Sequence, residues 1–363
     1  MTVVLAGQAG SVCGSYVMAI SMDTRLYCRA DGVRYIDAKP LRLVPGVTSK
    51  DSRIGYGRVQ SHIFDAIEAA GGIEWVKETS FDWDYRLLFG WPRSWQVGRA
   101  ADDVIYHTMF ESEELPEGWA NILNRTRLVW VPSVWCKDVF RDNGVTTDIM
   151  VSGYGVNRDE FPFEQRYPDD QFTFMTISHD LFDRKGGWQV WRAFCRLKLR
   201  GELKNALLLV KFQKGLATNL TKSGNPGWVM SEDGTKEVDG IAYIYRTMPQ
   251  AEYARLLHNA HCLVYPQRAE GFGLIPLEFM ATGGLAMVTN RTGCREYLRD
   301  DVAVVMPEEV TDSELEARMV WAYENRDAVC RMGQRAAEYV AQEWTWELAG
   351  LKARRLLYEF LGG

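Results

Sequence analysis

The stretch that decides the fold is CLVYPQRAEGFGLIPLEFMA, residues 262–281. Its first four residues, Cys262 to Tyr265, form a short apolar run typical of a buried strand, and residues 273–281 have the composition of a helix. Gly271 and Gly273 lie between the two, where glycine lets the backbone approach a ligand closely. Ligands of open α/β sheets bind at the carboxyl ends of strands, and a helix N-terminus attracts anions. The stretch therefore predicts a parallel sheet with a site for an anion such as a diphosphate.

Two glutamates frame this turn, with the spacing E-x7-E and the sequence E-G-F-G at the first of them. In this context the pair resembles the donor-site signature of the large family-four retaining glycosyltransferases, which have the GT-B fold. The resemblance implies that Glu270 binds the transferred sugar as a catalytic residue and that Glu278 binds ribose hydroxyls. It also assigns the turn between them to donor binding: Gly271, Phe272, Gly273 and Leu274.

A second block begins at the apolar run of residues 172–177, which predicts a strand, and ends in an amphipathic helix after Arg184-Lys185-Gly186. It resembles the strand, R-x(n)-K-G and helix unit of the same family, in which the lysine meets the donor phosphates. Lys185 matches that lysine, so the resemblance makes it a second catalytic residue. The upstream arginine of the family corresponds to His179 here, so Arg184 and His179 are the additional donor-binding candidates. The alternative is a solvated turn before a helix.

A third block places His107 at the end of an apolar run that begins at Val104. Several segments around it resemble the part of the family's sequence that leads into the interdomain linker. These segments are residues 104–111, 115–119, 128–133 and 153–157. The resemblance implies that His107 faces the cleft and contacts the transferred sugar, as a third catalytic residue. A structural histidine is the alternative.

Glycines also follow the apolar run Val3 to Leu5, as G-x-x-G-x-x-x-G from Gly7 to Gly14. This spacing is not the dinucleotide fingerprint, so it does not indicate NAD. In GT-B enzymes the loop after the first strand lies near the donor phosphates. The resemblance therefore makes Gly10 and Gly14 donor-binding candidates.

The alternation of strand-like and helix-like runs stops at the polar, proline-containing stretch 158–170 and then restarts. A chain of 363 residues is long enough for two domains. We expect an α/β protein of GT-B fold, with two Rossmann-like, doubly wound domains facing each other across a cleft. The acceptor-side domain is expected at residues 1–165 and the nucleotide-sugar domain at 166–343. By resemblance, a C-terminal helix at 344–363 packs back on the first domain.

The composition excludes several classes of protein. A net charge of -6 argues against bulk electrostatic binding to nucleic acid or an anionic membrane. No apolar run approaches the ~20 residues of a membrane span, and the N-terminus predicts a strand and not a signal peptide, so we expect a cytoplasmic protein. The seven cysteines form no C-x-x-C pair, which argues against a disulfide framework or a zinc site.

The stretch from Ala38 to His62 is basic in an otherwise acidic chain and predicts a long basic loop on the acceptor side. It supplies three acceptor-binding candidates: Lys50, Arg53 and Arg58. They indicate an anionic acceptor: a phospholipid surface, a lipid-linked sugar phosphate, or hydroxymethylated DNA of the kind that some viral GT-B enzymes modify. The alternative is a solvated loop whose counterions lie elsewhere on the surface.

The resemblance implies a retaining hexosyltransferase that moves a sugar from a nucleotide diphosphate donor, such as a UDP-sugar, to an acceptor hydroxyl. It implies no cofactor, because the nucleotide sugar is a substrate. Asp82-Trp83-Asp84 spells the D-x-D of metal-dependent enzymes, but it precedes a strand where those enzymes place it at a strand end, so we expect no metal. Two alternatives stay open: a sugar-nucleotide epimerase of GT-B fold, and a non-catalytic nucleotide-sugar binding protein.

Overall fold

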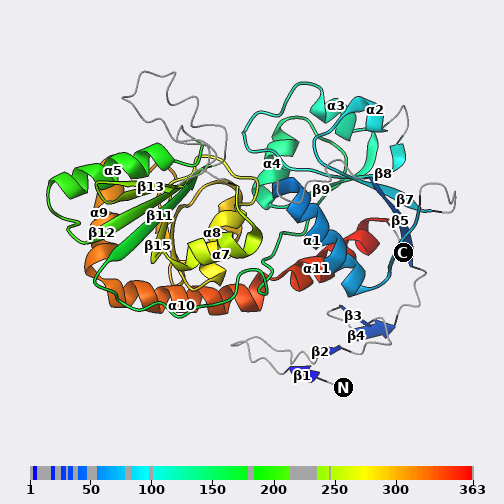
Figure 1. Cartoon of the computed structure of the whole chain (residues 1–363). Helices are drawn as coiled ribbons and strands as arrows, with labels where there is room; N and C mark the ends of the chain where they lie inside the picture. Colours follow the sequence, from blue (N-terminus) through cyan, green and yellow to red (C-terminus); the bar gives the residue numbers. More distant parts are fainter. Residues whose placement is uncertain are drawn as a thin grey trace.

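The computed structural model of the protein describes residues 3–5, 18–20, 26–29, 32–35, 40–46, 55–77, 83–97, 101–178, 184–212, 235–244 and 247–361. Most of these residues form two α/β bodies that lie side by side (Figure 1). Each body has a central parallel sheet, and helices cover the sheets. The expected α/β class with two doubly wound domains is therefore confirmed.

The N-terminal domain contains a six-stranded sheet in which every neighbouring pair is parallel. In spatial order its strands are β10 (Ile149–Val151), β9 (Thr126–Val131), β8 (Ala101–His107), β7 (Tyr85–Phe89), β5 (Leu41–Gly46) and β6 (Ile73–Trp75). The central strands are nearly continuous apolar runs, because helices bury both faces of a parallel sheet. The helices of this domain are α1 (Gly55–Ala70), α2 (Ser94–Val97), α3 (Trp119–Leu123) and α4 (Val134–Asp142).

The first strand of this sheet differs from the one expected. The run Val3–Leu5 is β1, which pairs antiparallel with β2 (Met18–Ile20), and β3 (Leu26–Arg29) pairs antiparallel with β4 (Gly32–Tyr35). Both pairs lie outside the six-stranded sheet. The sheet starts at β5, in the stretch for which a long loop was predicted, so that prediction was wrong. Proline has no backbone N–H to donate to a neighbouring strand. Pro45 is tolerated in β5 because β6 pairs only with residues 41–43, so the missing N–H leaves no carbonyl oxygen of β6 without a donor.

The C-terminal domain contains a seven-stranded sheet that is parallel except at one edge strand. In spatial order its strands are β13 (Thr235–Val238, antiparallel), β14 (Ile241–Ile244), β12 (Ala206–Phe212), β11 (Phe172–Ser178), β15 (Cys262–Tyr265), β16 (Leu285–Thr289) and β17 (Val304–Met306). Its helices are α5 (Gly187–Leu199), α7 (Gln250–His258), α8 (Leu274–Ala281), the short 3-10 helix η2 (Thr292–Glu296), α9 (Asp312–Glu324) and α10 (Arg326–Glu343).

The last helix, α11 (Trp346–Leu361), leaves the C-terminal domain and packs along α1 of the N-terminal domain (Figure 1). The two helices approach closely at Gly350, where a Cβ atom would lie 2.4 Å from the carbonyl oxygen of Ala66. Tyr358 donates a hydrogen bond to the carbonyl oxygen of Gly72, and Arg127 donates one of 2.9 Å to that of Phe360. The end of the chain thus ties the two domains together.

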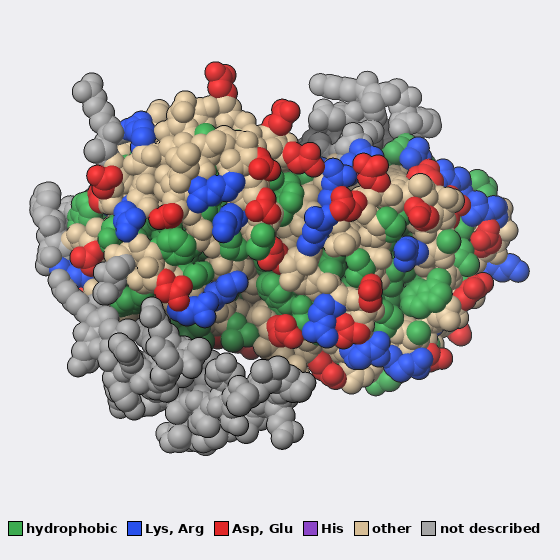
Figure 2. Space-filling view, turned by 180° about the vertical axis from the view of Figure 1, so that it is seen from behind, with side chains coloured by type: hydrophobic (Ala, Val, Ile, Leu, Met, Phe, Trp, Pro, Cys, Tyr) green, Lys and Arg blue, Asp and Glu red, His purple; other side chains and the backbone are tan. Residues whose placement is uncertain are grey.

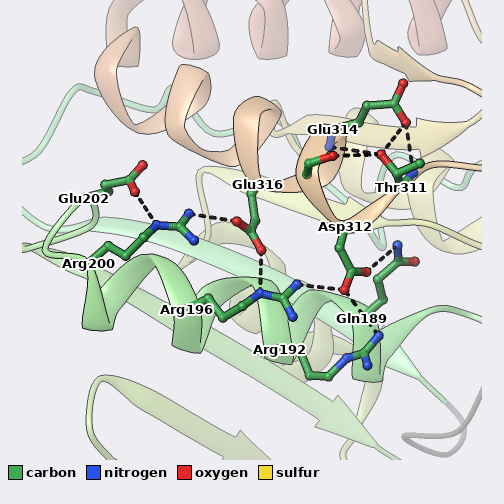
Figure 3. A network of polar contacts seen from close by, with 10 residues as sticks. Gln189, Arg192, Arg196, Arg200, Glu202, Thr311, Asp312, Glu314 and Glu316 are labelled. Carbon is green, nitrogen blue, oxygen red and sulfur yellow. Dashed lines mark hydrogen bonds and ion pairs between the residues drawn. The ribbon is translucent and has the colours of Figure 1, made fainter.

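A ladder of ion pairs joins α5 to α9 on the surface of the C-terminal domain (Figure 3). Arg196 lies 2.5 Å from Glu316 and 2.8 Å from Asp312, and Arg200 lies 2.7 Å from Glu316. The ladder starts at a capping box, in which Thr311 and the N3 residue of α9 exchange hydrogen bonds. Ion pairs that share partners in this way contribute more than isolated surface pairs.

No helix in the described part of the chain is long and apolar enough to cross a membrane.

Candidate active site

The carboxyl ends of β11 and β15 mark the position in the C-terminal domain where a ligand is expected. The chain leaves β11 toward β12 on one side, and it later returns to β15 on the other side. Open α/β sheets bind ligands at such a switch point. The segment 184–186 follows β11 and the segment 266–273 follows β15. Two motifs that lie far apart in the sequence therefore meet at one place.

Glu270 is the centre of a buried cluster of charged and polar groups at this switch point. Its Oε1 lies 2.9 Å from Nζ of Lys185 and 3.4 Å from Nη1 of Arg184, and it accepts a hydrogen bond of 2.6 Å from the hydroxyl of Tyr265. Burial raises the pKa of the Glu270 carboxyl, but Lys185, Arg184 and Tyr265 together lower it by more, and the net pKa lies below its ordinary value. Glu270 is therefore ionised at neutral pH, beside two cations.

A close approach of the two loops creates this cluster. Gly186 has φ +70°, and a Cβ atom there would lie 2.4 Å from the carbonyl oxygen of Pro266. The residue must therefore be glycine for both conformational and steric reasons. The N–H of Arg268 also donates a hydrogen bond of 2.7 Å to the carbonyl oxygen of Arg184. These contacts place Lys185 against Glu270.

The N-terminal domain reaches the same loop through the start of α4. The hydroxyl of Ser133, which caps α4, donates a hydrogen bond of 2.6 Å to the carbonyl oxygen of Gly271. The N–H of Val134 donates one of 2.7 Å to Oε1 of Glu296. Met109 packs so closely on Gly271 that a Cβ atom there would lie 2.9 Å from its sulfur. The Glu270 loop therefore lies between the domains.

Glu111 is a site residue to which the sequence reasoning assigned no role. It lies four residues after the end of β8, and its carboxylate is 3.1 Å from Nη1 of Arg184. Burial and the neighbouring Glu270 raise its pKa, while Arg184 and Lys185 lower it less. The position of Glu111 in the sequence could have identified it as a site residue, because the residues just after the carboxyl end of a parallel strand face the ligand.

His107 is fully buried in the aromatic core of the N-terminal domain. Its ring stacks on that of Phe89 at 4.3 Å, and the ring of Trp130 lies 4.5 Å away. Burial lowers its pKa to about 3, so the imidazole is neutral. Nε2 lies 3.5 Å from the hydroxyl of Tyr154, and Nδ1 has no partner among the described residues. Tyr154 in turn packs on Phe272 of the Glu270 loop. Direct contact between His107 and a sugar would require movement of the side chains that cover it.

Glu278 is buried on α8 and faces the N-terminal domain. Its Oε1 lies 3.2 Å from Nη1 of Arg58, whose other nitrogen lies 3.2 Å from Glu160. Burial raises the pKa of Glu278, and Arg58 opposes that rise. Arg58 was predicted to lie on a basic loop, but it belongs to the first turns of α1 and is paired with two carboxylates. That prediction of its surroundings was wrong, because the ion pairs join residues that are far apart in the sequence.

The rest of the turn contributes mainly backbone. Phe272 is buried against the rings of Tyr154, Tyr297 and Trp344. Gly273 precedes α8, and its carbonyl oxygen accepts a hydrogen bond of 2.5 Å from Tyr297. Leu274 is the first residue of α8. The N-terminus of α8 thus begins a few residues from the Glu270 cluster.

Comparisons with known proteins agree with this geometry. The family model described as glycosyl transferases group 1 matches residues 239–339, which contain both glutamates of the turn. The structure is similar to that of sucrose-phosphate synthase from Thermosynechococcus elongatus, with a TM-score of 0.66 at 13% identity over 88% of this chain and 98% of that chain. It is also similar to a glycosyltransferase from Rickettsia africae, with a TM-score of 0.63 at 14% identity over 90% and 100% of the two chains.

The chain has the GT-B fold. A third structure with this fold, Anabaena HepE in complex with UDP and glucose, gives a TM-score of 0.61 at 13% identity over 87% of this chain and 98% of that chain. No curated protein matches the sequence. The family model and the structural neighbours together support a glycosyltransferase of GT-B type.

Several predicted residues of the GT-B site lie outside the described part of the chain: Gly10, Gly14, Lys50, Arg53 and His179. Asp82 of the D-x-D sequence, at which no metal was expected, also lies outside it. The prediction for the two glycines rested on β1 as the first strand of the sheet. Because that strand is β5, the residues between it and α1 are 47–54, which also lie outside the described part. Asp84 accepts a hydrogen bond of 2.8 Å from the N–H of Arg42. Among the described residues, no group of three or more His, Cys, Asp or Glu side chains is placed to bind a metal ion.

Proposed function

We propose that the protein is a retaining hexosyltransferase of GT-B fold, which transfers a sugar from a nucleotide diphosphate donor, such as a UDP-sugar, to an acceptor hydroxyl. The observation that supports this most is the meeting of Lys185, Arg184 and Glu270 at the switch point of the C-terminal sheet. Two cations beside a helix N-terminus suit a diphosphate, and a carboxylate suits sugar hydroxyls. A cytoplasmic location, expected from the sequence, is part of this proposal.

In the proposed reaction, the bond between the anomeric carbon and the diphosphate oxygen breaks. A bond forms between that carbon and the acceptor oxygen on the same face of the sugar, and the acceptor proton passes to the leaving diphosphate. Lys185 and Arg184 stabilise the charge that develops on the leaving group, which is the largest electrostatic demand of the step. No metal or cofactor is needed in this scheme, because cations and amide dipoles of the protein offset that charge.

The remaining roles follow the resemblance. Glu270 and the backbone of residues 271–274 bind the transferred sugar, and the neutral ring of His107 contributes a hydrogen bond to it once the covering side chains move. Glu278 binds the ribose hydroxyls. Since Glu278 is now paired with Arg58, the nucleotide must either displace Arg58 or share the carboxylate with it.

A screen of hexoses linked to UDP, GDP, ADP and dTDP tests the proposal. A donor that stabilises the protein at 100 times its dissociation constant adds about 2.7 kcal/mol to the free energy of unfolding. That donor should then be hydrolysed slowly, releasing the nucleotide diphosphate and a free sugar whose anomeric proton shows retention in NMR spectra. Binding without release of sugar would instead support a non-catalytic binding protein, and conversion to an epimeric nucleotide sugar would support an epimerase.

A further inference from the structure

An exposed tryptophan lies at the carboxyl end of β7, on the edge of the N-terminal sheet where ligands bind. Trp91 follows Gly90, whose φ of +128° turns the chain sharply after the strand. Trp91 is 55% exposed, although it is flanked by two aromatic rings. The rings of Phe110 and Trp119 lie 6.2 Å and 5.9 Å from it, both edge to face. Trp119 is buried and Phe110 is half-buried, so both support Trp91, which presents the exposed ring. We call Trp91, Phe110 and Trp119 the aromatic shelf.

Buried contacts hold the rings of the aromatic shelf in place. The buried hydroxyl of Tyr106 lies 3.0 Å from the carbonyl oxygen of Trp91 and 2.6 Å from Oε1 of Gln96. Phe110 and Trp119 also contact each other, with ring centres 5.1 Å apart. An apolar surface that is ordered before binding loses little entropy when a ligand reaches it.

The shelf adjoins the proposed donor site. Phe110 is followed directly by Glu111, whose carboxylate pairs with Arg184 at 3.1 Å. Arg184 is in turn 3.4 Å from Glu270, which is proposed to bind the transferred sugar. A molecule lying on the shelf would therefore have a carboxylate beside it and the transferred sugar next to that carboxylate.

The charges near the shelf disfavour an anion. The segment after β8 carries four acidic residues, namely Glu111, Glu113, Glu114 and Glu117. Two cations of the C-terminal domain that contact this acidic segment are paired with it, Arg184 with Glu111 and Arg291 with Glu113 at 3.3 Å. The segment after Trp91 carries two opposing charges, the exposed Arg93 and, outside the described residues, Arg99. On the face shown in Figure 2, the coloured basic side chains are interspersed with acidic ones and form no broad basic field.

We propose that the aromatic shelf and Glu111 bind the acceptor, and that the acceptor is a neutral sugar ring. The apolar face of the sugar lies on Trp91, and Glu111 accepts a hydrogen bond from one of its hydroxyls, because a carboxylate can only accept. A hydroxyl of this ring forms the new bond to the anomeric carbon of the donor sugar, and its proton leaves with the diphosphate. This inference rests on the proposed function and specifies its acceptor.

Transfer from the donor found in the screen to neutral p-nitrophenyl hexosides tests the inference. Wild-type protein should transfer sugar to at least one of them. Trp91→Ala should raise the KM for that hexoside at least tenfold and lower the ratio of transfer to donor hydrolysis by a similar factor. Trp91→Tyr, which keeps an aromatic face, should stay within about threefold of wild type. Trp321→Ala, which removes an exposed tryptophan from α9, is the matched control and should change neither quantity.

The outcomes separate this inference from the proposed function. The inference alone would be overturned if the wild type hydrolyses the donor but wild type, Trp91→Ala and Trp91→Tyr have equal KM values for the hexoside. Transfer of sugar only to an anionic acceptor would also overturn the inference alone. Phosphatidylglycerol vesicles and hydroxymethylated duplex DNA are the anionic acceptors to test. Failure to hydrolyse any nucleotide sugar would overturn the proposed function, and the inference with it.

Discussion

Nη1 of Arg58 in α1 lies 3.2 Å from Oε1 of Glu278 in α8, so an ion pair connects the two domains at the residue expected to bind ribose. The pair is close to a second carboxylate, because Arg58 also contacts Glu160. A buried carboxylate needs such a partner, and a nucleotide that uses Glu278 must compete with Arg58 for it. The contact thus links donor binding to the contact between the domains.

Arg58→Met should bind the free nucleotide diphosphate more tightly, by about tenfold or 1.4 kcal/mol, because the ribose no longer competes with the guanidinium. The unliganded variant should be less stable by about 3 kcal/mol, because Glu278 is left buried without its cation. Calorimetric titration and denaturant unfolding measure the two effects. Arg355→Met, which removes an exposed ion pair on α11, is the control and should affect neither. Weaker nucleotide binding by Arg58→Met would mean that Arg58 itself contacts the ligand.

Glu278→Gln should weaken binding of the nucleotide diphosphate, because a charged acceptor of two ribose hydrogen bonds becomes a neutral one. We expect a loss of about tenfold in affinity, measured by the same titration. An affinity equal to that of the wild type would exclude Glu278 from the ribose site and leave it as a partner of Arg58.

The ion-pair ladder of Figure 3 predicts a pH-dependent contribution to stability. Burial raises the pKa of Glu316, but Arg200 and Arg196 lower it by more, so the folded-state pKa lies below the unfolded one. The carboxylate therefore stabilises the fold above the unfolded pKa of about 4.3, and this contribution is lost as the pH falls through the folded value.

Glu316→Gln should accordingly lower the midpoint of thermal unfolding by about 2–4 °C at pH 7, for a loss of about 1 kcal/mol, and by much less at pH 3. Scanning calorimetry at the two pH values measures the difference. Glu324→Gln, an exposed position on the same helix, should change the midpoint little at either pH. An equal loss for Glu316→Gln at both values would show that packing, and not charge, accounts for it.

The strands of the C-terminal domain could be predicted from the sequence because their signal is local. Residues 172–177 and 262–265 are apolar runs followed by glycine turns, and both are buried strands of the sheet. The start of the N-terminal sheet could not be predicted in the same way. In β5, Arg42 and Pro45 interrupt the apolar pattern, and its strand neighbours come from residues 73–75 and 85–88.

The candidate site shows the same division. The loops of Lys185 and Glu270 could be predicted because each is a strand, a glycine turn and a helix in sequence order. The pair of Arg58 and Glu278 joins residues from different domains, and no spacing rule specifies such a contact. The aromatic surroundings of His107 depend likewise on Phe89 and Tyr154, which lie on other segments. Local pattern thus predicts which loops form the site, whereas tertiary packing decides what their side chains contact.

Activity should survive prolonged dialysis against EDTA, because Lys185, Arg184 and helix N-termini are proposed to offset the charge of the diphosphate. Turnover before and after dialysis measures this directly. Loss of turnover that manganese restores would contradict the metal-independent scheme and would make Asp82 and Asp84 the first carboxylates to test.

Lys185→Ala should lower kcat by about two to three powers of ten, since it removes a cation whose effect is greatest as the diphosphate leaves. The fold should persist, because Lys185 lies on a loop before α5 and Glu270 keeps Arg184 and Tyr265 as partners. Initial rates of donor hydrolysis measure the loss, and thermal unfolding checks the fold. Lys204→Ala, at an exposed lysine of the same domain, is the matched control and should retain wild-type rates. Should Lys185→Ala turn over the donor as fast as this control, Lys185 would not contact the leaving group, and the phosphate site would have to be sought elsewhere.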